Sequence, residues 1–337
     1  MKIKSKKLSK VVSFLTGRQL SATRALPAVP SRVNAALSPE LSAAPVEAPK
    51  IWENLITLNS DVEPDFSLLR PASAYHDQDA RLKEWTELDY KDALARDSYP
   101  LPETKDREGY YGADHFSYWA SGLTDARLLL DAVRDHGTGE ISACLDLGCA
   151  SGRVLRHIAL SEPGCRAIGC DINRLHVEWC NAHLPDNCSA FQNHSVPSLP
   201  LEDNSLDAVT AYSVFTHIEA LETAWLTEIR RVLKPGGLAW VTVHTEHTLA
   251  DMRPDWPLWR PVMDHPDASG LLDSNRNFSG DRLVLRWLAE RSYSSNVFYK
   301  SDYLTSRWGR ILEVIELRRR HPSFQDVVLM RKPGGLR

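Results

Sequence analysis

The feature that most constrains the fold is a regular alternation of strand-like and helix-like segments that begins near His115. Short apolar runs predict strands at 141–147, 166–172, 189–193, 206–214, 238–244, 311–319 and 325–331. Apolar residues at helical spacing predict helices at 116–133, 152–160, 174–184 and 220–233. Such alternation favours a doubly wound α/β fold, with a mostly parallel seven-stranded sheet covered on both faces. The last two strands are only a few residues apart, which predicts an antiparallel hairpin at one end of the sheet.

Composition divides the remainder of the chain. Residues 1–50 are basic at first and then rich in Ala, Pro and Ser, which predicts a disordered tail and linker. Residues 51–114 mix scattered aromatics with many charges, and we expect an N-terminal extension of short helices that packs on the core. The main domain is predicted at 115–332. Within it, residues 245–309 are far longer than a simple crossover requires, which predicts an insertion.

Charge is distributed unevenly between the tail and the body. Residues 1–39 contain eight Lys and Arg and no acid, which leaves 32 basic against 44 acidic residues elsewhere. An acidic body disfavours a nucleic-acid partner. The basic tail either stays solvated or contacts anionic lipid or RNA. Its apolar segment is too short for a signal peptide, and no run of apolar residues reaches the roughly 18 of a membrane span, so we expect a cytoplasmic protein. Six cysteines without a disulfide spacing agree with that expectation.

The segment CLDLGCASGR at 144–153 follows the first predicted strand and has the small residues of a nucleotide-binding loop. Counted from Gly148, a dinucleotide fingerprint would need glycines at two positions that are Ala150 and Arg153. A phosphate-binding P-loop would need Gly-Lys-Ser/Thr, which is also absent. In an open sheet of this kind, a ligand still binds at the carboxyl ends of the strands, where this loop lies.

Two acids indicate which ligand the loop accepts. Asp171 ends the second predicted strand and can accept hydrogen bonds from ribose hydroxyls. Asp146, just before the turn, favours a cationic ligand and disfavours a phosphate. A nucleoside with a ribose, an adenine, an ammonium and a sulfonium satisfies both acids, and that nucleoside is S-adenosylmethionine (SAM).

Four motifs in order resemble those of the class I SAM-dependent methyltransferases: LDLGCASG, CDIN, LPLEDNSLDAV and RVLKPGGLAWVTV. The resemblance covers residues 115–332 in outline and implies a Rossmann-like fold, methyl transfer from SAM, and a cofactor site. The implied cofactor-binding residues are Asp146, Gly148, Cys149, Ala150, Gly152, Asp171, Ile172, Asn193 and Tyr212. The chain departs from the family pattern at Ala150, where glycine is usual, and at Asn193, where many members have an aspartate beside the adenine amino group.

Two histidines are candidate catalytic residues. His217 and His244 follow the fourth and fifth predicted strands, and either can act as a general base for an oxygen nucleophile. The alternative is that each ring caps a helix or packs in the core. A divalent metal at His244, His247 and His265, or zinc at Cys180, His183, Cys188 and His194, matches no standard spacing, and we predict no metal site.

Aromatic and arginine residues of the insertion form either a substrate lid or the insertion's own core. The aromatic residues are Trp256, Trp259, Trp287, Tyr293, Phe298, Tyr299, Tyr303 and Trp308. Tyr110, Tyr111, Tyr118 and Trp119 are candidates to close the other side of the site. We predict methylation of a hydroxyl or amine on a small-molecule or glycan-like acceptor. A nucleic-acid methyltransferase and a non-catalytic SAM-binding regulator or scaffold are the alternatives, and the sequence does not specify the oligomeric state.

Overall fold

The computed structural model describes residues 90–108, 110–287, 294–320 and 324–334. The predicted tail at 1–50 and most of the predicted extension at 51–114 lie outside the described residues. The strands are β1 (Ala143–Leu147), β2 (Arg166–Asp171), β3 (Cys188–Gln192), β4 (Leu206–Ala211), β5 (Leu233–Thr245), β6 (Arg282–Arg286), β7 (Ser295–Tyr299), β8 (Glu313–Arg318) and β9 (Asp326–Arg331). The helices that the sequence predicted are α5 (His115–His136), α6 (Leu155–Ser161), α7 (Arg174–His183) and α8 (Glu222–Val232). The other helical segments are α4 (Lys91–Arg96), α9 (Glu246–Asp251), α10 (Trp259–Met263), α11 (Ala268–Leu271), α12 (Ser301–Arg307), and the 3-10 turns η3 (Thr104–Arg107) and η4 (Trp308–Arg310).

The main sheet contains the seven predicted strands. β3, β2, β1, β4 and β5 are adjacent in that order and parallel. β9 then pairs antiparallel with β5, and β8 pairs antiparallel with β9, which confirms the predicted C-terminal hairpin. The strand order reverses between β1 and β4, so the loops after these two strands diverge and leave room for a ligand.

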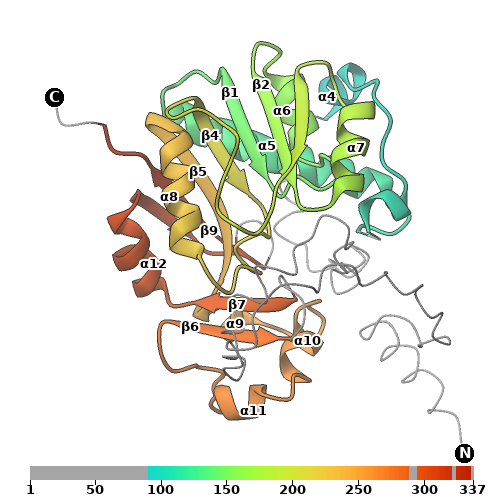
Figure 1. Cartoon of the computed structure of the whole chain (residues 1–337). Coiled ribbons are helices and arrows are strands. Elements are labelled where there is room, and N and C mark those ends of the chain that lie inside the picture. The colour runs from blue at the N-terminus through green and yellow to red at the C-terminus, as the bar shows by residue number, and fades with distance from the viewer. Residues whose placement is uncertain (1–89, 109, 288–293, 321–323, 335–337) are drawn as a thin grey trace, which may run out of the picture.

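Helices cover both faces of this sheet (Figure 1). Apolar side chains of α5, α6 and α7 pack on one face, and those of α8 and α12 pack on the other. Local sequence explains two of the helix starts. The Asp114 carboxylate accepts the Ser117 N–H at 2.9 Å and begins α5, and the Asn173 side chain accepts the Leu175 N–H at 3.0 Å and begins α7.

The insertion adds two strands that the sequence analysis did not predict. β6 and β7 form an antiparallel hairpin, and β7 pairs in parallel with the last two residues of β5, His244 and Thr245. Figure 1 shows this hairpin with α9, α10 and α11 below the main sheet. Its apolar core contains Leu249, Met252, Trp256, Leu258, Val262, Phe278, Leu283, Leu285 and Phe298, and Phe324, between β8 and β9, belongs to the same cluster. The insertion is therefore a small packed unit rather than a loop.

The described end of the N-terminal extension is tied to the main domain by a buried ion pair. Arg156 of α6 donates to the Asp97 carboxylate from Nε at 2.9 Å and from Nη2 at 2.7 Å. Trp119 of α5 donates to the same carboxylate through Nε1 at 2.6 Å. Both charged side chains are almost fully buried, so α4 and the turn after it are held against α5 and α6.

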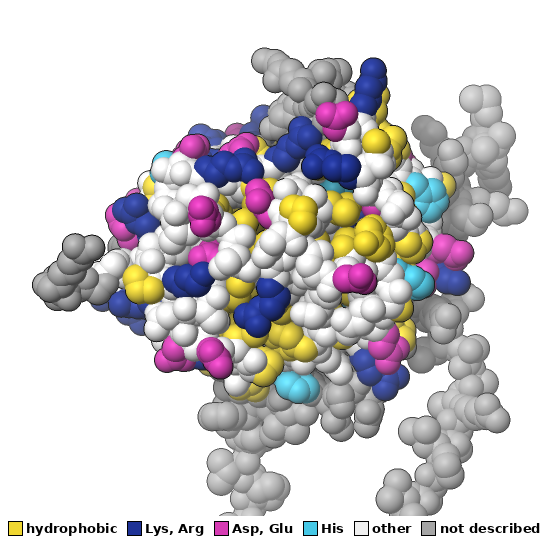
Figure 2. Space-filling model, turned by 90° about the horizontal axis from the view of Figure 1, so that it is seen from above, with side chains coloured by type: hydrophobic (Ala, Val, Ile, Leu, Met, Phe, Trp, Pro, Cys, Tyr) yellow, Lys and Arg dark blue, Asp and Glu magenta, His cyan; other side chains and the backbone are white. Residues whose placement is uncertain are grey.

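Two observations describe the outside of the molecule. Figure 2, seen from above Figure 1, shows Lys and Arg side chains interspersed with Asp and Glu over that face. Among the described residues, no helix combines the length and the apolar composition that crossing a bilayer would require.

Candidate active site

A pocket lies at the carboxyl ends of β1, β2 and β4, where the glycine loop at 148–152 turns away from the sheet. Gly148, Ala150 and Gly152 all have positive φ, at +74°, +45° and +75°. The N–H of Gly148 donates to the Cys170 carbonyl of β2 at 2.8 Å. A Cβ on Gly148 would lie 2.4 Å from Cγ2 of Val214, so only glycine fits here. The loop therefore presents backbone to the pocket.

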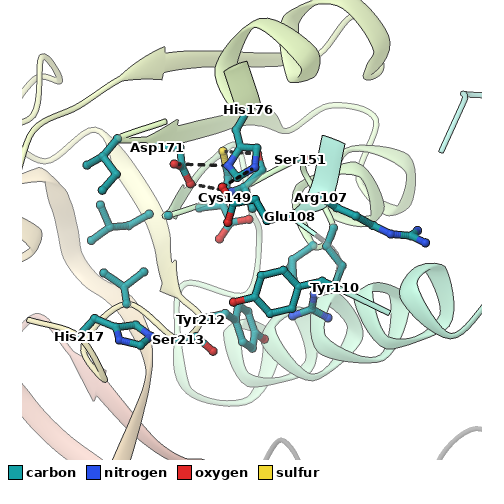
Figure 3. Close-up of a pocket in the computed structure, with 18 of the residues that line it drawn as sticks. Arg107, Glu108, Tyr110, Cys149, Ser151, Asp171, His176, Tyr212, Ser213 and His217 are labelled. Carbon is teal, nitrogen blue, oxygen red and sulfur yellow. Dashed lines mark hydrogen bonds and ion pairs between the residues drawn. The ribbon is translucent and has the colours of Figure 1, made fainter. Parts of the chain in front are cut away.

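Asp171 organises the next part of the pocket (Figure 3). Its carboxylate accepts the N–H of Ala150 at 2.9 Å and the N–H of Asn173 at 2.8 Å. The His176 Nδ1 lies 3.6 Å from Asp171 Oδ1, and its Nε2 lies 3.3 Å from Glu108 Oε1. Burial acts to lower the pKa of His176, but the nearby carboxylates of Asp171 and Glu108 outweigh it and raise the pKa. The loop and the acid thus hold each other in place, with lone pairs of the carboxylate left for a ligand.

Asp146 is a buried acid in the pocket lining, and its surface exposure is 2%. Burial raises the pKa of Asp146 to about 7. The Arg153 charge opposes this rise, whereas the Asp171 and Asp125 charges add to it. Arg153 is itself held by Asp125 of α5, with Nη1 2.5 Å from Oδ2. A cation in the pocket would favour the ionised form of Asp146.

Asn193, which follows β3, contributes an acceptor that nothing among the described residues satisfies. Its Oδ1 is buried without a hydrogen-bond partner there, while its Nδ2 donates to the His194 carbonyl at 3.4 Å. Buried acceptors of this kind are rarely left unpaired in native proteins. The amide oxygen therefore indicates a ligand that brings a hydrogen-bond donor.

The two candidate histidines occupy different environments. His217 lines the pocket, and its Nδ1 lies 2.7 Å from the Ser295 carbonyl of β7, so Nδ1 carries the proton in the neutral ring and Nε2 has the lone pair. His244 is buried in the insertion core and stacks on Phe298 and Phe324, with ring centroids 5.2 and 5.9 Å away. His244 is not among the residues that line the pocket.

Comparison with known proteins identifies the domain. Residues 145–241 match the family model described as a methyltransferase domain. Residues 145–241 are a SAM-dependent methyltransferase domain. SAM is accordingly the cofactor of this domain.

Individual relatives of this methyltransferase domain vary in what their names say they methylate. The sterol 24-C-methyltransferase of Schizosaccharomyces pombe is 28% identical over 173 residues, which cover 48% of this chain and 45% of the relative. The glycine/sarcosine/dimethylglycine N-methyltransferase of Actinopolyspora halophila is 25% identical over 280 residues, which cover 76% of this chain and 45% of the relative. The match thus spans less than half the length of these relatives. The solved structure of the Burkholderia thailandensis 1,6-didemethyltoxoflavin-N1-methyltransferase shares 15% identity over 69% of this chain and 92% of that one, with a TM-score of 0.42.

Most of the predicted cofactor residues lie together at the methyltransferase pocket. Its lining includes Asp146, Gly148, Cys149, Ala150, Asp171, Ile172, Asn193 and Tyr212. Gly152 is not in the lining, because its α-carbon faces Leu184 of the α7 end and a Cβ there would lie 2.5 Å from Cδ1 of that leucine. Tyr110, Tyr111 and Tyr118 line the pocket as expected, whereas Trp119 packs away from it.

Other candidates are not brought together. No group of three or more His, Cys, Asp or Glu side chains in the described parts of the chain is arranged to hold a metal ion, so neither candidate metal set is assembled. Tyr293, one of the candidate lid aromatics, lies outside the described residues. The described aromatic residues of the insertion are not in the pocket lining, and Trp256, Phe298, Tyr299 and Trp308 are buried in the cores.

Sequence reasoning missed Arg107, Glu108 and His176, which also line the pocket. The two on the extension precede the first strand by more than 30 residues and belong to no motif. His176 sits in a helix whose spacing looks ordinary. The path of the extension, whose η3 lies against the glycine loop, places Arg107 and Glu108 at the site, and α7 places His176 there.

Proposed function

We propose that this chain is a SAM-dependent methyltransferase that acts on a hydroxyl or amine of a small-molecule acceptor. The observation that supports this proposal is the composition of one pocket. It combines three groups: the buried acid Asp146, whose pKa is about 7, the Asn193 amide oxygen, which has no partner among the described residues, and His217, whose tautomer is fixed. The acid matches the positive charge of the cofactor, the amide oxygen matches its adenine amino group, and the histidine can accept the proton that the reaction releases.

The residues of the pocket fit SAM from one end to the other. Asp171 accepts from the ribose hydroxyls with the lone pairs that its two backbone hydrogen bonds leave. Asn193 accepts from the adenine amino group through Oδ1, its unsatisfied atom. Asp146 faces the sulfonium end, where a positive charge offsets the cost of burying the carboxylate. Ile172 and Tyr212 supply apolar wall beside these polar groups.

His217 is the residue we assign to proton removal. When bound, SAM supplies an electrophilic methyl group, and transfer to a nucleophile requires mainly alignment. The Ser295 carbonyl keeps the proton on Nδ1 of His217 and so leaves Nε2 as the base. An acceptor hydroxyl that loses its proton to Nε2 becomes the stronger nucleophile. His244, sandwiched between Phe298 and Phe324, is assigned to packing.

The wall around His217 is mainly apolar. Val214 and Ile218, which are close to His217 in the chain, belong to the pocket lining, as do Trp225 and Phe324. Such a wall recognises an acceptor by its apolar body, with few polar contacts to orient the reacting group. The acceptor is therefore a compact molecule whose hydroxyl or amine is carried on an apolar frame, rather than a polymer chain.

The experiment has two steps. Purified protein is titrated with SAM by calorimetry, and conversion of SAM to S-adenosylhomocysteine (SAH) is then measured with pools of small hydroxyl and amine compounds. Tight SAM binding without conversion on any pool or cell extract would favour the non-catalytic scaffold. For the base, His217→Asn keeps a donor for the Ser295 carbonyl but removes the base, and we expect kcat on a hydroxyl acceptor to fall about 10²- to 10⁴-fold with SAH affinity unchanged. His183→Gln, on the exposed side of α7, is the matched control.

A further inference from the structure

The guanidinium of Arg107 belongs to the pocket lining and combines near-complete burial with two donors left unmatched among the described residues. Arg107 is 2% exposed and ends η3. Its Nη2 donates to the Gly112 carbonyl at 2.5 Å, and its central carbon lies 4.8 Å above the Tyr118 ring. Nε and Nη1 are also buried, and no described residue accepts a hydrogen bond from them. An unmatched buried cation is costly, so a ligand that completes its hydrogen bonds is expected.

The surroundings specify an anion. Burial lowers the pKa of Arg107, but an arginine remains charged at neutral pH even so. No carboxylate in the described parts of the chain forms an ion pair with this side chain, and the neighbouring wall is built of Tyr111 and Tyr118. A carboxylate matches both the charge and the donors of a guanidinium, and it does so strongly where water is excluded.

The position of Arg107 indicates whether the cofactor or the acceptor brings this carboxylate. η3 contacts the glycine loop, because Ser151 donates through Oγ to the Asp106 carbonyl, and the Tyr118 hydroxyl donates to the Ser151 carbonyl at 3.3 Å. Figure 3 shows Arg107 and His217 on opposite sides of the pocket. An acceptor must lie beside His217, so the far side is left for the cofactor.

We propose that Arg107 binds the methionine carboxylate of SAM, through the two donors that the protein leaves unmatched. This assignment rests on the proposed function. It gives the N-terminal extension a role in cofactor binding, since η3 carries the arginine across the glycine loop. The backbone turns sharply after η3, where Glu108 and Tyr111 both have positive φ, at 55° and 62°.

The test compares two ligands that differ only in the carboxylate: SAH and decarboxylated SAH. Binding of each is measured by calorimetry to the full chain and to Arg107→Met, with Arg260→Met on the exposed side of α10 as control. We expect Arg107→Met to weaken SAH binding about 10- to 100-fold and to leave decarboxylated SAH binding within about twofold of wild type. Arg107→Lys, which keeps the charge in case the first variant folds poorly, should lose less SAH affinity and again none for the decarboxylated ligand.

The other outcomes overturn the inference in different ways. Equal weakening of both ligands would mean that Arg107 only supports the fold of the extension. Unchanged SAH binding together with a raised KM for the acceptor would assign the carboxylate to the acceptor instead. Failure of the wild-type chain to bind either ligand would overturn the proposed function and this inference with it.

Discussion

Asp146 gives the sharpest prediction, because its buried carboxyl links folding to pH. Its pKa rises from the ordinary 3.8 to about 7 in the folded chain. At a pH between these two pKa values, the folded state keeps a proton that the unfolded state has lost. The stability contributed by this proton is full below the unfolded pKa and is lost as the pH rises through 7. Integrated from about pH 5 to about pH 8, the loss from this one group is about 2 to 3 kcal/mol.

Asp146→Asn removes the titration and keeps the shape of the side chain. Urea unfolding of both proteins at intervals between about pH 5 and pH 8 should therefore show the variant gaining about 2 to 3 kcal/mol relative to wild type over that range. All other titrating groups are common to the two proteins and cancel in the difference. A stability difference that stays constant with pH would refute the raised pKa and the reasoning from burial.

The cofactor provides an independent measurement of the same group. SAM carries a sulfonium and SAH does not, so ionised Asp146 should favour SAM over SAH. We expect the ratio of the two affinities to rise with pH through 7 in wild type and to stay flat in Asp146→Asn. A flat ratio in both proteins would place the sulfonium away from this acid.

Three further changes test other parts of the structure. Asp171→Ala should weaken SAM binding by about 1 to 3 kcal/mol, measured by calorimetry, and unchanged affinity would contradict the ribose assignment. Gly148→Ala should abolish SAM binding or lower Tm, because the new Cβ would lie 2.4 Å from Val214 Cγ2 at a positive φ; normal binding and Tm would show that the loop adapts. Asp97→Ala should cost about 3 to 5 kcal/mol in urea unfolding by leaving Arg156 buried without its carboxylate, and a loss below about 1 kcal/mol would show that water replaces it.

The main sheet was predictable because the apolar runs and the helical spacing in the local sequence match the strands and helices that the sheet topology requires. Each of the seven predicted strands is present, since a buried parallel strand is a short apolar run and the helices between them keep their spacing. The glycine loop was predictable for a similar reason, because it directly follows β1, and the two acids, Asp146 and Asp171, lie at the ends of β1 and β2. Ala150 also takes the left-handed conformation expected of the glycine usual at that position, with φ of +45°.

The insertion and the pocket cover were not predictable in the same way. β6 and β7 pair with each other over a gap of several residues, and β7 joins the sheet only through the last two residues of β5. Nothing in the local sequence marks so short a contact. The surroundings of His244 were not predictable for that reason: its position after a central strand resembles that of His217, but β7 pairs beside it and Phe298 stacks on its ring. The position of Arg107 depends on how η3 lies against the glycine loop, which no periodicity encodes.

Strand β5, which pairs with β4, β9 and β7, also has a consequence for how the chain folds. β5 is completed on one side by β4, which precedes it closely, and on the other by β9, more than 80 residues later. Until β9 is synthesised and docks, the backbone of Leu238 to Val243 offers a long apolar edge to other chains. The insertion lies between the two strands and delays that closure. A chain shortened before Asp326 should therefore aggregate during refolding, while the full chain hides the same edge behind β9 and β8.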